Sequence, residues 1–112
     1  MTSKEISAVD LYWRPGCGFC ARLDRTLEPT GIAINRHNIW ESDDAAAFVR
    51  SVANGNETVP TVQIGETSMV NPSAAEVLQV LQRDAPHLIP EGVEVPEGSK
   101  VGKMVGKLLG GG

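Results

Sequence analysis

The sequence predicts an α/β fold in which helices flank a four-stranded mixed sheet. Short runs of alternating apolar residues are typical of strands, and apolar residues at helical spacing between them are typical of helices. The last two expected strands are separated only by Gly65-Glu66, which indicates a hairpin. The expected order is therefore β-α-β-α-β-β-α, within a single domain because the chain has only 112 residues.

The first three elements are predicted from apolar spacing and from residues that interrupt regular structure. Alternation within residues 6–13 predicts the first strand. Apolar residues then recur at helical spacing from Cys20 to Leu27, and Pro29 ends this helix. A second strand is expected from Ile32 to about His37.

Capping residues and turns mark the remaining elements. These are a helix that Ser42 begins and Asn54-Gly55 ends, strands Thr61–Ile64 and Thr67–Val70, and a helix capped by Asn71-Pro72 or Ser73 whose apolar face reaches Leu81.

Composition argues against several classes of protein. A net charge of −4 argues against a general nucleic-acid binder, which needs clustered Lys and Arg. Two cysteines are too few for an extracellular scaffold held by disulfides. The start of the chain lacks the apolar stretch of a secretory signal, and no apolar run is long enough to cross a bilayer. We therefore expect a cytoplasmic protein without stable membrane association, and a monomer in view of its small size.

The most informative motif is Cys17-Gly18-Phe19-Cys20, between the first strand and the first helix. Two intervening residues place both sulfurs on one side of the first helical turn, where they can interconvert between dithiol and disulfide. The helix macrodipole favours a thiolate at the first cysteine. The same spacing also occurs in structural thiol pairs and zinc sites, but His37 and His87 fit no zinc-finger pattern, so we expect no metal site.

In this context the chain resembles the glutaredoxin branch of the thioredoxin-fold family. The resemblance covers roughly residues 5–85 and depends on three motifs that occur in the family's order. These motifs are Cys17-Gly18-Phe19-Cys20, Thr58-Val59-Pro60 before the third strand, and Val70-Asn71-Pro72-Ser73-Ala74 before the last helix. The resemblance implies a thioredoxin-like, glutaredoxin-type fold and the activity of a thiol–disulfide oxidoreductase.

The resemblance also implies roles for matching residues. Cys17 would be the nucleophile and Cys20 the resolving thiol, with Arg14 favouring the Cys17 thiolate. Pro60 would be a cis proline beside the sulfurs, and the backbone of Val59 would pair with the substrate. The complete set expected to bind substrate or thiol is Arg14, Phe19, Thr58, Val59, Pro60, Asn71 and Ser73.

One segment departs from the glutaredoxins that use glutathione. They generally have Gly-Gly and an acidic residue before the last helix, whereas this chain has Asn71-Pro72-Ser73-Ala74, which resembles the actinobacterial mycoredoxins. The implied function is reduction of mixed disulfides between proteins and mycothiol, or another low-molecular-weight thiol, as co-substrate. No tightly bound cofactor is expected, and the implied partners are thiolated or disulfide-containing proteins.

Two other functions remain open. A dithiol electron donor to ribonucleotide reductase would share this short fold and would depend on Cys20. A [2Fe–2S] cluster carrier is the other alternative, since relatives with Cys-Gly-Phe-Ser bind a shared cluster through the first cysteine. Here Cys20 replaces that serine, which favours disulfide closure over cluster binding.

The end of the chain differs in composition from the rest. We expect residues 1–89 to form the glutaredoxin-like domain, and residues 90–112 to be a Pro/Glu/Gly linker followed by a mobile, basic, Gly-rich tail. Apolar residues from Val101 to Leu108 share a helical stripe beside lysines, but the interspersed glycines weaken an isolated helix. Docking of this stripe onto the domain, a partner or a membrane surface is the alternative.

Overall fold

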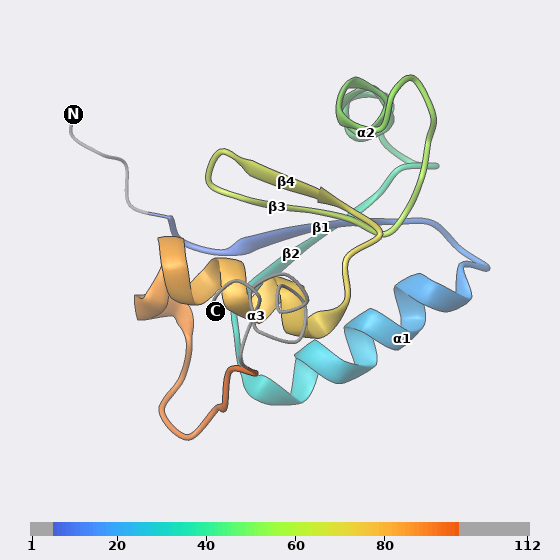
Figure 1. The fold of residues 1–112 in the computed structure, drawn as a ribbon. Helices are drawn as coiled ribbons and strands as arrows, with labels where there is room; N and C mark the ends of the chain where they lie inside the picture. Colours follow the sequence, from blue (N-terminus) through green and yellow to red (C-terminus); the bar gives the residue numbers. More distant parts are fainter. Residues whose placement is uncertain (1–5, 97–112) are drawn as a thin grey trace, which may run out of the picture.

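The computed structural model describes residues 6–96. The predicted order β-α-β-α-β-β-α is confirmed over this range (Figure 1). The elements are β1 (Val9–Trp13), α1 (Gly18–Leu27), β2 (Ile34–Asn38), α2 (Asp43–Val52), β3 (Thr61–Ile64), β4 (Thr67–Val70) and α3 (Ala74–Asp84). Two short 3₁₀ helices follow α1 and α3, at Glu28–Thr30 and Pro86–Leu88.

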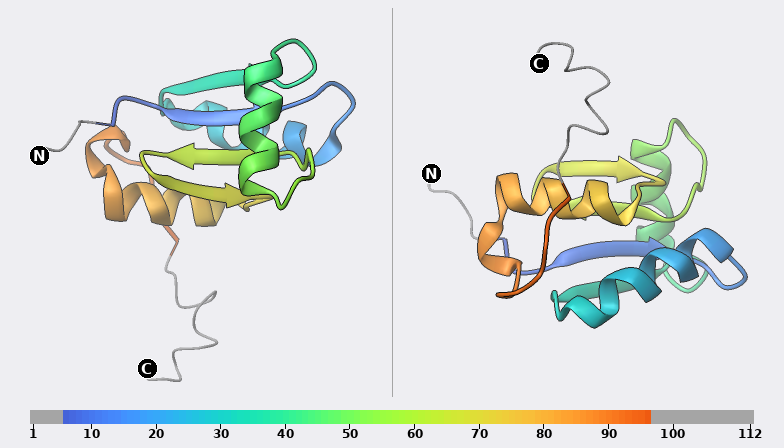
Figure 2. Two further views of the ribbon diagram at one scale, coloured as in Figure 1. Left: turned by 90° about the horizontal axis from the view of Figure 1, so that it is seen from above. Right: turned by 60° about the horizontal axis from the view of Figure 1, so that its bottom comes forward.

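The four strands form one mixed sheet in the order β2-β1-β3-β4. β1 pairs in parallel with β2 and antiparallel with β3, and β3 pairs antiparallel with β4. Helices α1 and α3 lie on one face of the sheet and α2 crosses the other (Figure 2). Because β1 and β2 run in parallel, both end at the same edge of the sheet, where α1 begins.

Local side chains account for three element boundaries. The Ser42 hydroxyl accepts the Ala45 N–H at 3.1 Å and caps α2 as predicted. Of the two predicted caps for α3, Ser73 is the one used, in a capping box with Glu76. β2 begins at Ile34 instead of the predicted Ile32, because the Ile32 N–H donates to the hydroxyl of Thr30 instead of joining the sheet.

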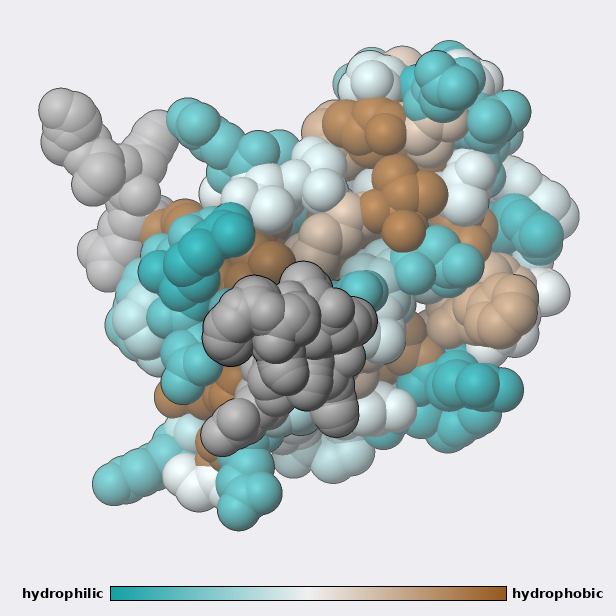
Figure 3. Space-filling view, in the orientation of Figure 1, coloured by the Kyte–Doolittle hydropathy of each residue, from teal (hydrophilic) through white to brown (hydrophobic). Residues whose placement is uncertain are grey.

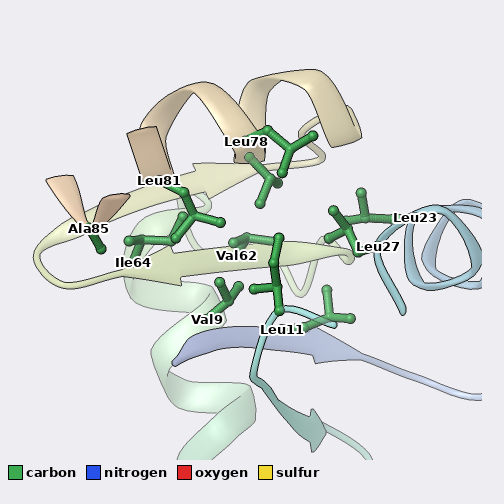
Figure 4. Packing of buried hydrophobic residues seen from close by; sticks show 11 residues of the cluster. Val9, Leu11, Leu23, Leu27, Val62, Ile64, Leu78, Leu81 and Ala85 are labelled. Carbon is green, nitrogen blue, oxygen red and sulfur yellow. The ribbon is translucent and has the colours of Figure 1, made fainter. Parts of the chain in front are cut away.

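The main hydrophobic core lies between the sheet and helices α1 and α3. Figure 4 shows buried side chains of β1, β3, α1 and α3 pointing toward one another, and Leu11, Val62 and Leu81 among them are at most 2% exposed. A smaller cluster around Tyr12 and Val49 fills the space under α2. On the surface of the face seen in Figure 1, hydrophobic residues lie in small areas between hydrophilic ones (Figure 3).

The first part of the predicted linker lies against the domain. Val93 and Val95 are partly buried against the main core, and the Gln79 side-chain amide donates to the Pro96 carbonyl at 3.1 Å. The predicted boundary at residues 89 and 90 remains a prediction. The predicted basic stripe lies within residues 97–112, outside the described residues.

None of the helices between residues 6 and 96 combines the length and the apolar character that a bilayer crossing requires. The longest, α3, has 11 residues.

The main core provides a direct test of this packing. Replacing Leu81 by Ala removes a fully buried side chain between α3 and the sheet, and we expect a loss of about 2–5 kcal/mol in the free energy of unfolding. Urea titration followed by circular dichroism measures this change. Val70→Ala is the matched control, because Val70 is 41% exposed, and should change stability much less. Equal losses in both variants would contradict the assigned core.

Candidate active site

The two cysteines form a disulfide at the start of α1. Cys17 is the N-cap residue of this helix, and its sulfur accepts the Cys20 N–H at 3.1 Å. Cys17 is half-buried, whereas Cys20 is only 4% exposed. After reduction, an incoming disulfide can therefore reach Cys17 and not Cys20. The helix N-terminus and the Cys20 N–H both stabilise negative charge on the Cys17 sulfur.

The loop before β3 lies directly beside this disulfide. The Val59–Pro60 peptide bond is cis, which confirms the geometry that the family resemblance implied. The Val59 carbonyl oxygen lies 3.7 Å from the Cys17 sulfur. The fully buried Thr61 donates its hydroxyl to the Thr58 carbonyl at 2.8 Å and so fixes the shape of this loop.

The start of α3 is attached to the same loop. The Asn71 N–H donates to the Pro60 carbonyl at 2.7 Å. Asn71 has a φ of 55°, in the left-handed region that asparagine adopts more readily than most residues. This bend directs the chain from β4 into α3 beside the first turn of α1.

A pocket of about 260 Å³ lies between α1 and the start of α3, and we name it the Asn71 pocket. Its polar lining comes from Arg22 and Thr26 of α1 together with Asn71 and Ser73, and the ring of Phe19 forms one wall. Three predicted thiol-binding residues, Phe19, Asn71 and Ser73, therefore come together. The Ser73 oxygen already accepts the Glu76 N–H at 3.1 Å, so its hydroxyl hydrogen is what remains for a ligand.

Arg14 lies elsewhere in the site. Its guanidinium donates to the Pro15 carbonyl at 3.1 Å and lies 5.6 Å from the centre of the Trp40 ring, in a cation–π arrangement. It lines a second pocket of about 260 Å³, together with both cysteines, which we name the Arg14 pocket. The structure thus does not place Arg14 with the residues of the Asn71 pocket.

Sequence reasoning assigned no function to Trp40. Trp40 follows the end of β2 just as Arg14 follows the end of β1, and parallel strands bring their carboxyl ends to one edge of a sheet. The pairing of these two strand ends is the sequence signal that could have indicated a contact between Arg14 and Trp40. That contact also depends on the register of β1 with β2, in which Trp13 pairs with Asn38, and no local sequence pattern specifies this register.

Charged groups near the site are partly neutralised. Asp24 of α1 and Arg36 of β2 form an ion pair at 2.6 Å, and both line the Arg14 pocket. Burial, and secondarily the Asp10 carboxylate, raise the pKa of Tyr12, which lines neither of the two pockets. Within residues 6–96, no group of three or more His, Cys, Asp or Glu side chains is arranged to hold a metal ion.

Sequence comparisons agree with this geometry. The family model described as Glutaredoxin matches residues 9–69. A Mycobacterium tuberculosis protein named as a glutaredoxin is 43% identical over 72 residues, which cover 63% of this chain and 86% of that protein. Mycoredoxin 1 of Corynebacterium glutamicum is 32% identical over 78 residues, which cover 69% of this chain and 96% of that protein.

Solved structures share the fold. A thioredoxin-like protein aligns with a TM-score of 0.58 at 17% identity, over 69% of this chain and 97% of that one. Reduced glutaredoxin C1 of Populus tremula x tremuloides aligns with a TM-score of 0.51 at 24% identity, over 74% of this chain and 72% of that one. At these identities the two structures establish only the thioredoxin-like fold. With the family match, the fold and the cysteine pair in agreement, the chain belongs to the glutaredoxin family and is a thiol–disulfide oxidoreductase.

Proposed function

We propose that this protein reduces mixed disulfides between proteins and mycothiol, or a closely similar low-molecular-weight thiol. The observation that carries the proposal is the reachable Cys17 sulfur beside the cis-proline loop, together with the Asn71 pocket, whose α1 wall runs from Phe19 to Thr26. The similarity to mycoredoxin 1 supports the same assignment.

The reaction is two successive thiol–disulfide exchanges. The Cys17 thiolate attacks the sulfur of the small thiol, the mixed disulfide breaks, and the protein thiolate leaves and takes a proton from water. A second molecule of the small thiol then attacks the Cys17-bound sulfur as a thiolate. This step releases the symmetrical small disulfide and restores the Cys17 thiolate, so the second small thiol is the reductant.

Main-chain groups are suited to hold the reacting sulfurs. The Val59 carbonyl is close to the Cys17 sulfur, and we assign the Val59 backbone to pairing with the cysteine part of the small thiol. Thr58 and Pro60 shape this loop, since the Thr61 hydroxyl binds the Thr58 carbonyl and the Pro60 carbonyl accepts the Asn71 N–H. We assign Arg14 to favouring the Cys17 thiolate through its positive charge, because both residues line the Arg14 pocket.

The lining of the Asn71 pocket favours a hydroxyl-rich thiol. Arg22, Asn71 and Ser73 offer hydrogen-bond donors, and Phe19 offers an aromatic face that is 62% exposed. The Thr26 hydroxyl donates to the Arg22 carbonyl at 3.0 Å, so its oxygen offers an acceptor for a ligand hydroxyl. Among the described residues, none that lines this pocket carries a carboxylate that could pair with the ammonium group of glutathione. A sugar-like thiol fits this chemistry better than glutathione does.

A second candidate is a dithiol electron donor that reduces protein disulfides. The Cys17–Cys20 disulfide favours it, because it is the oxidised product of that cycle. The cluster carrier is less well supported, since Cys20 can close onto Cys17. For either redox cycle we propose a cytoplasmic location, where reducing conditions return the pair to the dithiol.

Substitution of each cysteine separates the two cycles. Cys17→Ser should abolish turnover of every disulfide, because it removes the attacking sulfur. Cys20→Ser should retain turnover of a mycothiolated peptide, because a second small thiol can regenerate Cys17, and should lose reduction of a protein disulfide. Coupled NADPH oxidation with mycothiol and its reductase measures both activities. Loss of mycothiolated-peptide turnover in Cys20→Ser would contradict the proposed main cycle.

The Asn71 pocket can be tested by filling it. Thr26→Leu places a bulky apolar side chain on its wall, and we expect the KM for a mycothiolated peptide to rise about tenfold, equivalent to roughly 1.4 kcal/mol. Arg25→Leu is the matched control, because Arg25 is exposed on the same helix and lines neither pocket. An unchanged KM in Thr26→Leu would remove this pocket from thiol binding.

A further inference from the structure

Helix α1 presents two different stripes to two different pockets. Cys20, Ala21 and Asp24 line the Arg14 pocket, whereas Phe19, Arg22 and Thr26 line the Asn71 pocket. Residues three and four apart share a helix face, so the two pockets open on different sides of α1. Cys17, at the N-cap of the helix, lines the Arg14 pocket directly.

We propose that the Arg14 pocket binds the protein half of the mixed disulfide, and that it selects an apolar side chain with an acidic residue next to the thiolated cysteine. The inference rests on the proposed function, because a mixed disulfide has two halves and the Asn71 pocket accounts for only the small thiol. The Arg14 pocket is continuous with the reacting sulfurs, since both cysteines form part of its wall.

The walls of this pocket are suited to an apolar side chain. Leu11, Trp13 and Ala21 contribute apolar surface, and the pocket of about 260 Å³ is large enough for one aliphatic or aromatic side chain. Trp40 extends this surface outward, because its ring is 62% exposed and lies beside the Arg14 guanidinium. Tryptophan and arginine are among the residue types that most often dominate binding at protein interfaces.

The charges around the Arg14 pocket favour a partner with an acidic residue next to its thiolated cysteine. Arg36 is already neutralised by Asp24 at 2.6 Å. Arg14 makes no ion pair with any carboxylate of residues 6–96, and its guanidinium contacts the Pro15 carbonyl and the Trp40 ring. A partner carboxylate would therefore complete the hydrogen bonding of Arg14.

The test compares two peptides that carry the same mycothiol group. In one peptide aspartate and leucine flank the thiolated cysteine, and in the other lysine and serine do. We expect the wild-type protein to prefer the first peptide by about tenfold in kcat/KM, equivalent to roughly 1.4 kcal/mol. Equal kcat/KM values for the two peptides would overturn the proposal.

Two substitutions test whether the Arg14 pocket causes the preference for the aspartate–leucine peptide. Ala21→Leu fills the pocket from an exposed helix position, and Trp40→Ala removes the aromatic surface, so each should bring the ratio of the two kcat/KM values close to one. The control Arg25→Leu should keep the wild-type ratio. A ratio unchanged in both Ala21→Leu and Trp40→Ala would place the preference elsewhere and overturn the assignment.

A second readout is independent of mycothiol. The same two peptides are joined instead to 5-thio-2-nitrobenzoate through a disulfide. The Cys17 thiolate of the reduced protein breaks this disulfide, and Cys20 then closes onto Cys17, so that the dithiol is oxidised and both the peptide thiol and the coloured thiolate are released. The aspartate–leucine peptide should react about tenfold faster, a difference of roughly 1.4 kcal/mol in activation free energy. If this preference appears while neither mycothiolated peptide is turned over, the proposed function fails and the peptide-binding pocket stands. Equal rates would overturn the pocket assignment.

Discussion

The hydrogen bond from the Asn71 N–H to the Pro60 carbonyl, at 2.7 Å, is the constraint on which the site depends. It joins the cis-proline loop to the start of α3, while the Val59 carbonyl of the same loop lies 3.7 Å from the Cys17 sulfur. Three segments far apart in the sequence are thereby fixed around one sulfur. The sheet supports this arrangement, because the register of β3 with β4 pairs Thr61 with Val70 and so brings Pro60 and Asn71 face to face.

The order and type of the elements could be predicted because each has a local signal. Ser42 and Ser73 cap their helices through their own hydroxyls, and the hairpin of β3 and β4 follows from the Gly65-Glu66 turn. Boundaries that depend on a single hydrogen bond were less predictable. The side chain of Thr30 binds the Ile32 N–H, and the start of β2 moves to Ile34 for that reason.

The site was predictable only where a motif fixes the geometry. The spacing of Cys17 and Cys20 predicted a pair that can close to a disulfide, and the family resemblance implied the cis Val59–Pro60 peptide bond beside it. Arg14 was expected to favour the Cys17 thiolate, and it lines the same pocket as Cys17, but its contact with Trp40, apart from Phe19, Asn71 and Ser73, was not predicted. The position of Arg14 apart from the Asn71 pocket depends on the turn after β2. The register of the sheet sets where this turn lies relative to α1, and no residue close to Arg14 in the sequence does so.

The exchange chemistry requires that Cys17 be ionised and reachable once the disulfide is reduced. The most direct measurement is the rate of iodoacetamide alkylation of Cys17 at neutral pH in reduced Cys20→Ser protein, compared with a free cysteine peptide. We expect alkylation about tenfold faster than that of the peptide, whose thiol is only a few per cent ionised at this pH. Alkylation no faster than that of the peptide would contradict the exchange chemistry and leave the cysteines as a structural pair.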